Sequence, residues 1–186
     1  GRILSDAERR LVAYHEMGHA LVGHLSPHCD PVDRVTGIPQ GEALGITVAL
    51  PAEDRFIATR DECVERLRMM MAGRAAEQLV FGELTTGAAD DLARAAALAR
   101  RMVGELGMAC STTEASLAAG LPGVTGDEAA ESAARSLVED AFRAATALLR
   151  EHGELLHRAA ARLLECDAVE RDELGELLGP RPHVER

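Results

Sequence analysis

The sequence predicts a mainly α-helical fold with one small β-sheet, and three observations support this prediction. Alanine occurs 33 times among the 186 residues, whereas aromatic residues make up only 2% of the chain. A core of small and aliphatic side chains favours closely packed helices over a β-sandwich. Apolar residues recur at helical spacing over most of the length, and β-branched residues are concentrated in one short region.

The first expected helix begins after Ser5 and ends near Pro27. Ser5 and Glu8 form a capping-box pattern, in which each side chain accepts a hydrogen bond from a backbone amide at the helix start. Two β-branched segments follow, Val32–Ile38 and Gly45–Leu50, separated by proline and glycine. They predict two short strands of one sheet.

Further helices are expected from caps and apolar spacing. Thr59 and Glu62 repeat the capping box and predict a helix that ends at Gly82, and Thr125 begins a similar pattern. A turn is expected at residues 85–88. The remaining expected helices cover residues 89–106, 127–151, 154–166 and 170–178.

We divide the chain into three parts of one domain. Residues 1–108 form the expected core, residues 109–126 an irregular connection rich in glycine, and residues 127–186 a C-terminal helical part. The methionines at positions 69–71 are expected to pack in the core, because methionine at this spacing fills irregular gaps between helices.

Composition excludes several classes of function. The net charge is −11 and all 20 basic residues are arginine, so the chain has no basic surface for nucleic acid and no lysine for a P-loop or a Schiff base. The four cysteines lack a C-x-x-C pair, which is typical of a reducing compartment. No apolar run reaches the length of about 18 residues that spans a membrane, so we expect this fragment itself to be soluble.

The segment His15-Glu16-Met17-Gly18-His19 has the H-E-x-x-H pattern of helical zinc sites. Four residues advance a helix by about 6 Å and rotate it by about 400°, so both imidazoles project from one face. Two such nitrogens can ligate one Zn²⁺, with one zinc expected per chain. Glu16 lies about 100° around the helix from His15, where its carboxylate can act as a general base toward water beside the metal.

A catalytic zinc needs a third protein ligand, and the residues alone leave three candidates open. Asp90 and Asp91 follow a turn at a helix start, where acidic residues also complement the helix dipole. Glu77 lies on the second expected helix, where Arg74 at i−3 offers it an ion pair.

Two other histidines are not expected to bind zinc. His24 follows His19 by five residues and points about 140° away from it, so we expect it to be solvated or locally hydrogen-bonded. His28 lies beyond the expected helix end and is predicted to be at the surface. Gly18 leaves the helix bare at a point where a substrate backbone or a second strand can approach.

Several sequence blocks occur in a defined order over residues 4–109. They are Tyr14–Leu21, Asp30–Val32, Ala43–Thr47, Pro51–Arg55, Gly73–Glu77, Val80–Glu83, Thr85–Leu92 and Ala99–Val103. Together they resemble the peptidase domain of FtsH, which is peptidase family M41. In this family an aspartate of the Thr-Gly-Ala-x-x-Asp-Leu segment completes the zinc site. The resemblance therefore implies His15, His19 and Asp91 as metal ligands and Glu16 as the catalytic base.

The resemblance implies a zinc metalloendopeptidase that hydrolyses unfolded polypeptides, with its small sheet near the active site. It also implies a homo-hexamer, a membrane anchor in the full protein with this domain on the cytoplasmic side, and ATP dependence only through an AAA+ ATPase domain outside this chain. We expect Gly45–Leu50 to pair with an extended substrate. The alternatives are a zinc hydrolase of small amides and a non-catalytic assembly module.

Overall fold

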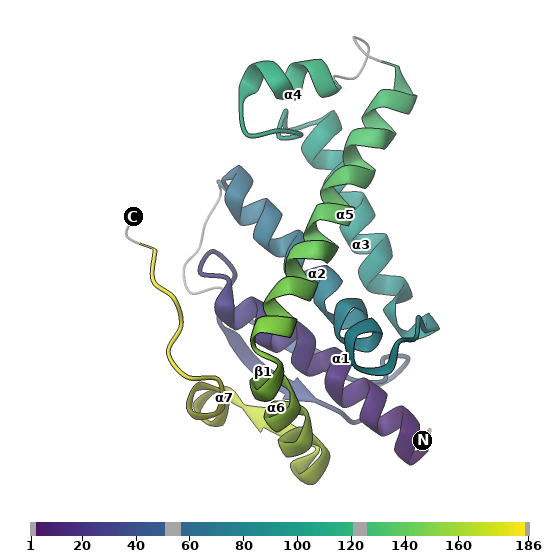
Figure 1. The fold of residues 1–186 in the computed structure, drawn as a ribbon, viewed down its shortest axis with the longest axis vertical. Helices are drawn as coiled ribbons and strands as arrows, with labels where there is room; N and C mark the ends of the chain where they lie inside the picture. The colour runs from purple at the N-terminus through teal and green to yellow at the C-terminus, as the bar shows by residue number, and fades with distance from the viewer. Residues whose placement is uncertain (1–2, 51–56, 121–125, 185–186) are drawn as a thin grey trace.

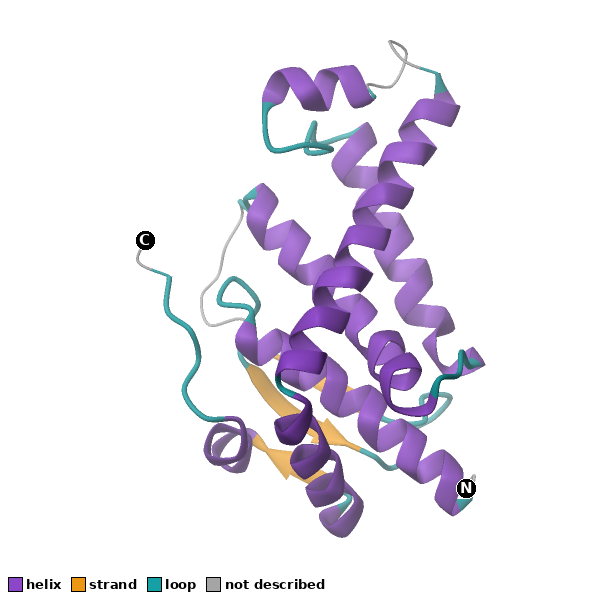
Figure 2. Cartoon of the chain, in the orientation of Figure 1, coloured by secondary structure: helices purple, strands orange, loops and turns teal. Residues whose placement is uncertain are grey.

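The structure, a computed structural model, describes residues 3–50, 57–120 and 126–184. In chain order the elements are α1 (Asp6–Leu25), β1 (Val32–Thr36), β2 (Ile46–Ala49), α2 (Arg60–Phe81), the 3₁₀ turn η1 (Thr86–Ala88), α3 (Ala89–Gly104), α4 (Thr113–Ala119), α5 (Asp127–Glu151), α6 (Gly153–Cys166), β3 (Ala168–Glu170) and α7 (Arg171–Leu178). The structure consists mainly of helices, with a small antiparallel sheet at one end beside α1, α6 and α7 (Figures 1 and 2), which confirms the predicted fold class. None of the described helices is long and apolar enough to span a membrane.

Both predicted capping boxes are present. Glu8 Oε2 accepts a hydrogen bond from the Ser5 amide at 2.8 Å, and the Ser5 hydroxyl accepts one from the Glu8 amide at 3.3 Å. Thr59 and Glu62 make the same reciprocal pair at the start of α2. The helix ends at Gly82, whose φ of 68° is a left-handed conformation that glycine adopts at little cost. Local sequence therefore determines where both helices begin and where α2 ends.

Two local features differ from the sequence predictions, and a third predicted feature lies outside the described residues. Part of the segment expected to be irregular forms α4, which Thr112 caps by accepting a hydrogen bond from the Ala115 amide. Strand β3 was not predicted, because three residues are too few to show a pattern. The predicted cap at Thr125 lies outside the described residues, and the N-cap of α5 is Gly126. The division of the chain into three parts stays a prediction.

The sheet has the order β2-β1-β3, and both pairs of strands are antiparallel. Val35 in the central strand lies opposite Thr47 of β2 and Val169 of β3. Among the described residues β2 has β1 as its only partner strand, so its other edge is open for backbone pairing. The sheet packs against α1, and this contact brings β2 next to the helix that carries the H-E-x-x-H pattern.

Two apolar clusters form the core. One joins α1, β1, β3, α6 and α7 with the C-terminal parts of α2 and α5, and the other joins α3 with the N-terminal parts of α2 and α5. Helix α5 contributes to both because it extends from the region of α4 to that of α6 (Figure 1). Met71 is buried, and Met69 and Met70 pack against the clusters, so the predicted core role of these methionines is confirmed.

Gly18 allows α1 and α2 to approach closely. A Cβ atom at this position would lie 2.7 Å from the Ala76 Cβ and 2.8 Å from the Ala72 carbonyl oxygen, distances that real side chains do not show. The expectation of a substrate backbone or a second strand at this glycine is therefore wrong, because α2 occupies the space. The face of α1 that carries Gly18 therefore packs directly against α2.

Candidate metal centre

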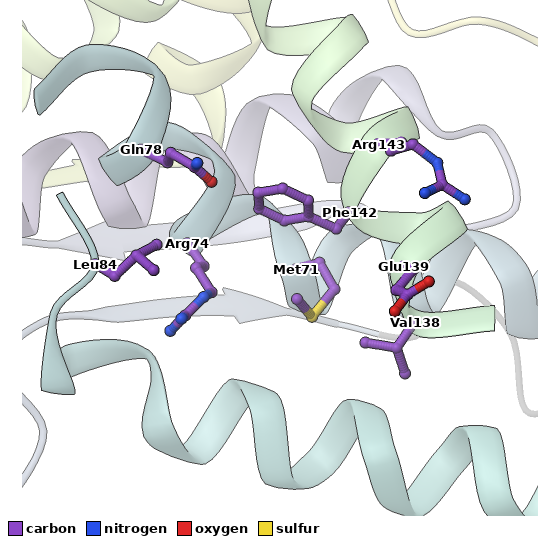
Figure 3. Close-up of a pocket in the computed structure, with 8 residues that line it drawn as sticks. All are labelled: Met71, Arg74, Gln78, Leu84, Val138, Glu139, Phe142 and Arg143. Atoms are coloured by element: carbon purple, nitrogen blue, oxygen red, sulfur yellow. The ribbon is translucent and has the colours of Figure 1, made fainter. Parts of the chain in front are cut away.

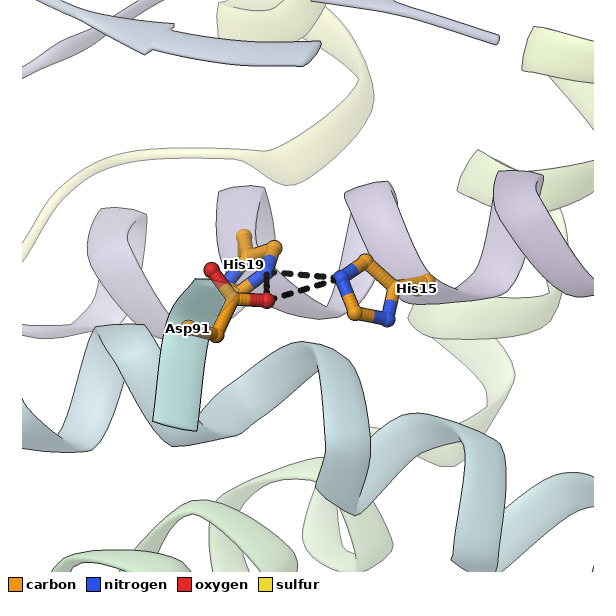
Figure 4. Close-up of side chains that lie close together, drawn as sticks. All are labelled: His15, His19 and Asp91. Atoms are coloured by element: carbon orange, nitrogen blue, oxygen red, sulfur yellow. Dashed lines mark hydrogen bonds and ion pairs between the residues drawn. The ribbon is translucent and has the colours of Figure 1, made fainter. Parts of the chain in front are cut away.

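Three potential metal ligands converge between α1 and the start of α3 (Figure 4). His15 Nε2 and His19 Nε2 each lie 3.0 Å from Asp91 Oδ2, and the two nitrogens lie 3.1 Å apart. Both histidines are buried, and the Asp91 side chain is 18% exposed. In the part of the chain that the structure describes, this is the one group of His, Cys, Asp and Glu side chains with metal-binding geometry.

The backbone of α2 closes one side of this cluster at Gly73. A Cβ atom there would lie 2.5 Å from His15 Nε2 and 2.6 Å from His19 Nε2. Only a residue without a side chain leaves both imidazoles in their present positions. Gly73 was part of a sequence block that resembles the family, but sequence reasoning assigned it no role.

A backbone contact orients the His19 ring. Its Nδ1 lies 2.6 Å from the Met69 carbonyl oxygen, which can only accept a hydrogen bond. Nδ1 therefore carries the proton, and the lone pair of Nε2 points into the cluster, where a metal requires it. The imidazole is thus held in the tautomer that binds a cation.

The two neighbouring aspartates have different environments. Asp90 is exposed, whereas Asp91 lies in the first turn of α3 and faces α1. The preceding turn is anchored by Thr85, whose hydroxyl donates a hydrogen bond to Glu77 Oε1 at 2.7 Å and accepts one from the Gly87 amide. This anchored turn sets the position at which Asp91 enters the helix.

Glu77 lies behind the cluster. Its carboxylate is fully buried, and Oε1 lies 3.6 Å from His15 Nδ1, on the side of the ring away from Asp91. Among the described residues, Glu77 does not form the expected ion pair with Arg74. A carboxylate behind a histidine fits the supporting role that such groups play around metal ligands.

The electrostatics of the cluster favour a positive charge among the three donor atoms. Burial alone would lower the pKa of His15, but its hydrogen bond to Asp91 and the nearby carboxylates of Glu77 and Glu16 raise it to about 10. Burial would raise the pKa of Asp91, yet its hydrogen bonds to His15 and His19 hold it well below the usual range. Two imidazole nitrogens and one carboxylate oxygen form a donor set that suits zinc, so the residues fit this metal.

Glu16 is buried beside the cluster and held by strand β2. The Thr47 hydroxyl lies 2.7 Å from Glu16 Oε2 and 3.0 Å from the Glu16 carbonyl oxygen. A Cβ atom at Gly45, directly before β2, would lie 2.8 Å from Glu16 Cγ, so the backbone there also packs on the side-chain stem. Sequence reasoning missed both contacts. The available signal was that Gly45 and Thr47 both lie in the segment predicted as a strand, although β2 begins only at Ile46.

Comparison with known protein families identifies the family of this chain. The family model described as peptidase family M41 matches residues 2–177. This chain belongs to that family.

Named relatives of the M41 chain are bacterial proteases. It is 43% identical over 96% of its length to "ATP-dependent zinc metalloprotease FtsH 2" of Sphaerobacter thermophilus, of which it covers 28%. It is 40% identical over 99% of its length to "ATP-dependent zinc metalloprotease FtsH 3" of Symbiobacterium thermophilum, of which it covers 32%. The chain thus spans about a third or less of the length of these relatives.

The other two histidines near the motif of this M41 chain lie outside the cluster of His15, His19 and Asp91. His24 is buried, and its Nε2 lies 2.7 Å from the Gly179 carbonyl oxygen at the end of α7. The expectation of a solvated or locally bonded ring is therefore wrong, because its partner comes from the other end of the chain. His28 is half-buried rather than at the surface, with Nδ1 3.0 Å from Glu65 Oε1.

A separate apolar pocket lies between α2 and α5 (Figure 3). Its volume is about 400 Å³. It is lined by Met71, Arg74, Gln78, Leu84, Val138, Glu139, Phe142 and Arg143. None of the predicted M41 site residues is among them.

Proposed function

We propose that this chain is the zinc endopeptidase domain of an ATP-dependent protease of FtsH type, and that it hydrolyses peptide bonds of unfolded polypeptides. The observation that carries this proposal is the convergence of His15, His19 and Asp91 on one point, with donor atoms 3.0–3.1 Å apart. The names of the M41 relatives support the same reaction class.

We assign four residues to the reaction. His15, His19 and Asp91 hold one zinc ion per chain, and Glu16 is the general base. When bound, zinc lowers the pKa of a coordinated water to about 7 and polarises the substrate carbonyl. The Glu16 carboxylate accepts the proton of the attacking water and passes it to the nitrogen of the departing amine.

The substrate binds as an extended strand along β2. This strand has an open edge in the described part of the sheet, and it lies against α1 beside Glu16. Backbone hydrogen bonds to such an edge bind a polypeptide with little dependence on its sequence. Unfolded chains are suitable substrates because only they present an extended backbone.

We further propose the assembly that the family resemblance implies. The chain lacks lysine and its relatives are named ATP-dependent, so ATP acts through an AAA+ domain outside these residues, as the family resemblance implies. Identical subunits form a hexamer, and a membrane anchor in the full protein leaves this domain on the cytoplasmic side. Residues 1–108, 109–126 and 127–186 act as parts of one protease domain. The two alternative functions, hydrolysis of small amides and non-catalytic assembly, are not favoured.

Zinc content and casein digestion test the proposal together. Glu16→Gln should keep one zinc per chain and lose about 10²- to 10⁴-fold in turnover, because it removes a base but no ligand. His15→Ala should lose both zinc and activity, whereas His28→Ala, outside the cluster, serves as the matched control. A fully active Glu16→Gln variant would contradict the mechanism, and cleavage of small amides without cleavage of casein would favour the first alternative.

A further inference from the structure

Strand β2 holds the Glu16 side chain more closely than the role of a general base requires. A glutamate side chain has several rotatable bonds, so an unsupported carboxylate samples many positions. Here Thr47 Oγ1 lies 2.7 Å from Oε2, a length typical of a hydroxyl that donates to a carboxylate. Among the described residues no other side chain hydrogen-bonds this carboxylate. The hydroxyl therefore holds one carboxylate oxygen in place.

Gly45 restricts the same side chain from another direction. It lies directly before β2, and an ideal Cβ atom at Gly45 would point at α1, where it would meet Val12 Cγ1 and Glu16 Cγ. The space that a Cβ atom would fill at Gly45 is taken by Glu16 Cγ, at 2.8 Å from the ideal Cβ position. The stem of Glu16 thus rests on the backbone at Gly45, directly before β2, while its carboxylate accepts a hydrogen bond from the Thr47 hydroxyl.

The strand that holds Glu16 is also the strand with the open edge. Thr47 lies opposite Val35 of β1, and β2 has no partner strand on its other side in the described residues. We propose that Thr47 is a positioning residue, which fixes the Glu16 carboxylate relative to the strand on which the substrate is aligned. The inference rests on the proposed function. It adds the residue that sets the position of the general base relative to the bound substrate.

A set of four variants tests this role. Thr47→Val keeps the shape and removes the hydroxyl, Thr47→Ser keeps the hydroxyl, and Thr47→Ala removes both the hydroxyl and the methyl group. Thr36→Val is the matched control, because Thr36 on the neighbouring strand is buried and its hydroxyl has no hydrogen-bond partner in the described residues. Each variant is measured for zinc content, thermal unfolding, and kcat and KM on fluorescently labelled casein.

Thr47→Val and Thr47→Ala should lower kcat by about 10- to 100-fold, as small displacements of catalytic groups do, with one zinc per chain and an unchanged KM. Thr47→Ser and Thr36→Val should have the kcat of the wild type. This pattern distinguishes positioning of the base from support of the strand, because a weakened strand would raise KM and would not be rescued by serine.

Several results would overturn the inference. They are a wild-type kcat in Thr47→Val, a loss carried by KM alone, or a Thr47→Ser variant as slow as Thr47→Ala. If Thr47→Val does not fold, the pair of serine and alanine variants decides, because they differ by the hydroxyl alone. If zinc-loaded wild type does not cut casein, the proposed function fails and the inference with it, whereas wild-type cleavage with normal Thr47 variants contradicts the inference alone.

Discussion

Replacing Gly73 by alanine tests whether His15 and His19 bind one metal together. The added Cβ would lie 2.5 Å from His15 Nε2 and 2.6 Å from His19 Nε2, whereas ordinary contacts begin at 3.4 Å. Each nitrogen must therefore move by about 0.8–0.9 Å, or α2 must shift away from α1. Zinc sites tolerate deviations of only about 0.2 Å in donor distance.

The two rings have little freedom to accommodate this methyl group. His19 Nδ1 is held 2.6 Å from the Met69 carbonyl oxygen, and His15 Nδ1 lies 3.6 Å from Glu77. We expect zinc affinity to fall by at least about tenfold, as it does when groups that orient metal ligands are lost. Alanine gains about 1 kcal/mol over glycine within a helix, and overpacking costs about 1–3 kcal/mol. The free energy of unfolding without metal should therefore fall by no more than about 2 kcal/mol.

Competition titration against a chromophoric zinc chelator measures the affinity, and urea unfolding measures the stability. Gly175→Ala in α7 is the control, because a Cβ atom there meets nothing within 4 Å. It should bind zinc as the wild type does and be more stable by about 0.4–1 kcal/mol. A folded Gly73→Ala variant with wild-type zinc affinity would refute the reasoning that the backbone at Gly73 sets the positions of both ligands.

Three further predictions concern other parts of the fold. Asp91→Ala should lose most of its zinc, measured as metal per chain, whereas Asp90→Ala should retain it, because only Asp91 faces the histidines. Burial lowers the pKa of His24 from 6.5, so the folded state prefers the neutral ring and stability should fall as the pH drops below about 6.5. Urea unfolding between pH 7 and pH 5 measures this loss, and a His24→Gln variant with an equal loss would contradict the reasoning. Gly18→Ala should lower the free energy of unfolding by about 1–3 kcal/mol, because the new Cβ would meet α2; a wild-type thermal unfolding curve would contradict this.

Much of the fold could be predicted because its signals are local. The capping boxes at Ser5 and Thr59 and the glycine after α2 mark helix ends through contacts within four residues. The H-E-x-x-H spacing brings two imidazoles to one helix face without reference to the rest of the chain. Helix α4 and strand β3 escaped prediction, since one is short within a glycine-rich segment and the other has three residues paired with a distant strand.

The sequence by itself determined the helical fold class, the positions of most helices and the two histidines of the motif, because hydrogen bonding and side-chain spacing within a few residues decide these features. From the residues alone, three acidic side chains remained equal candidates for the third ligand, and only the resemblance singled out Asp91. The tertiary structure brings Asp91 to His15 across 76 residues of chain and leaves Glu77 behind the ring. The tertiary structure also decided that α2 closes the cluster at Gly73 and that β2 holds Glu16. Such contacts depend on how helices and strands pack in three dimensions, and no periodicity along the chain encodes them.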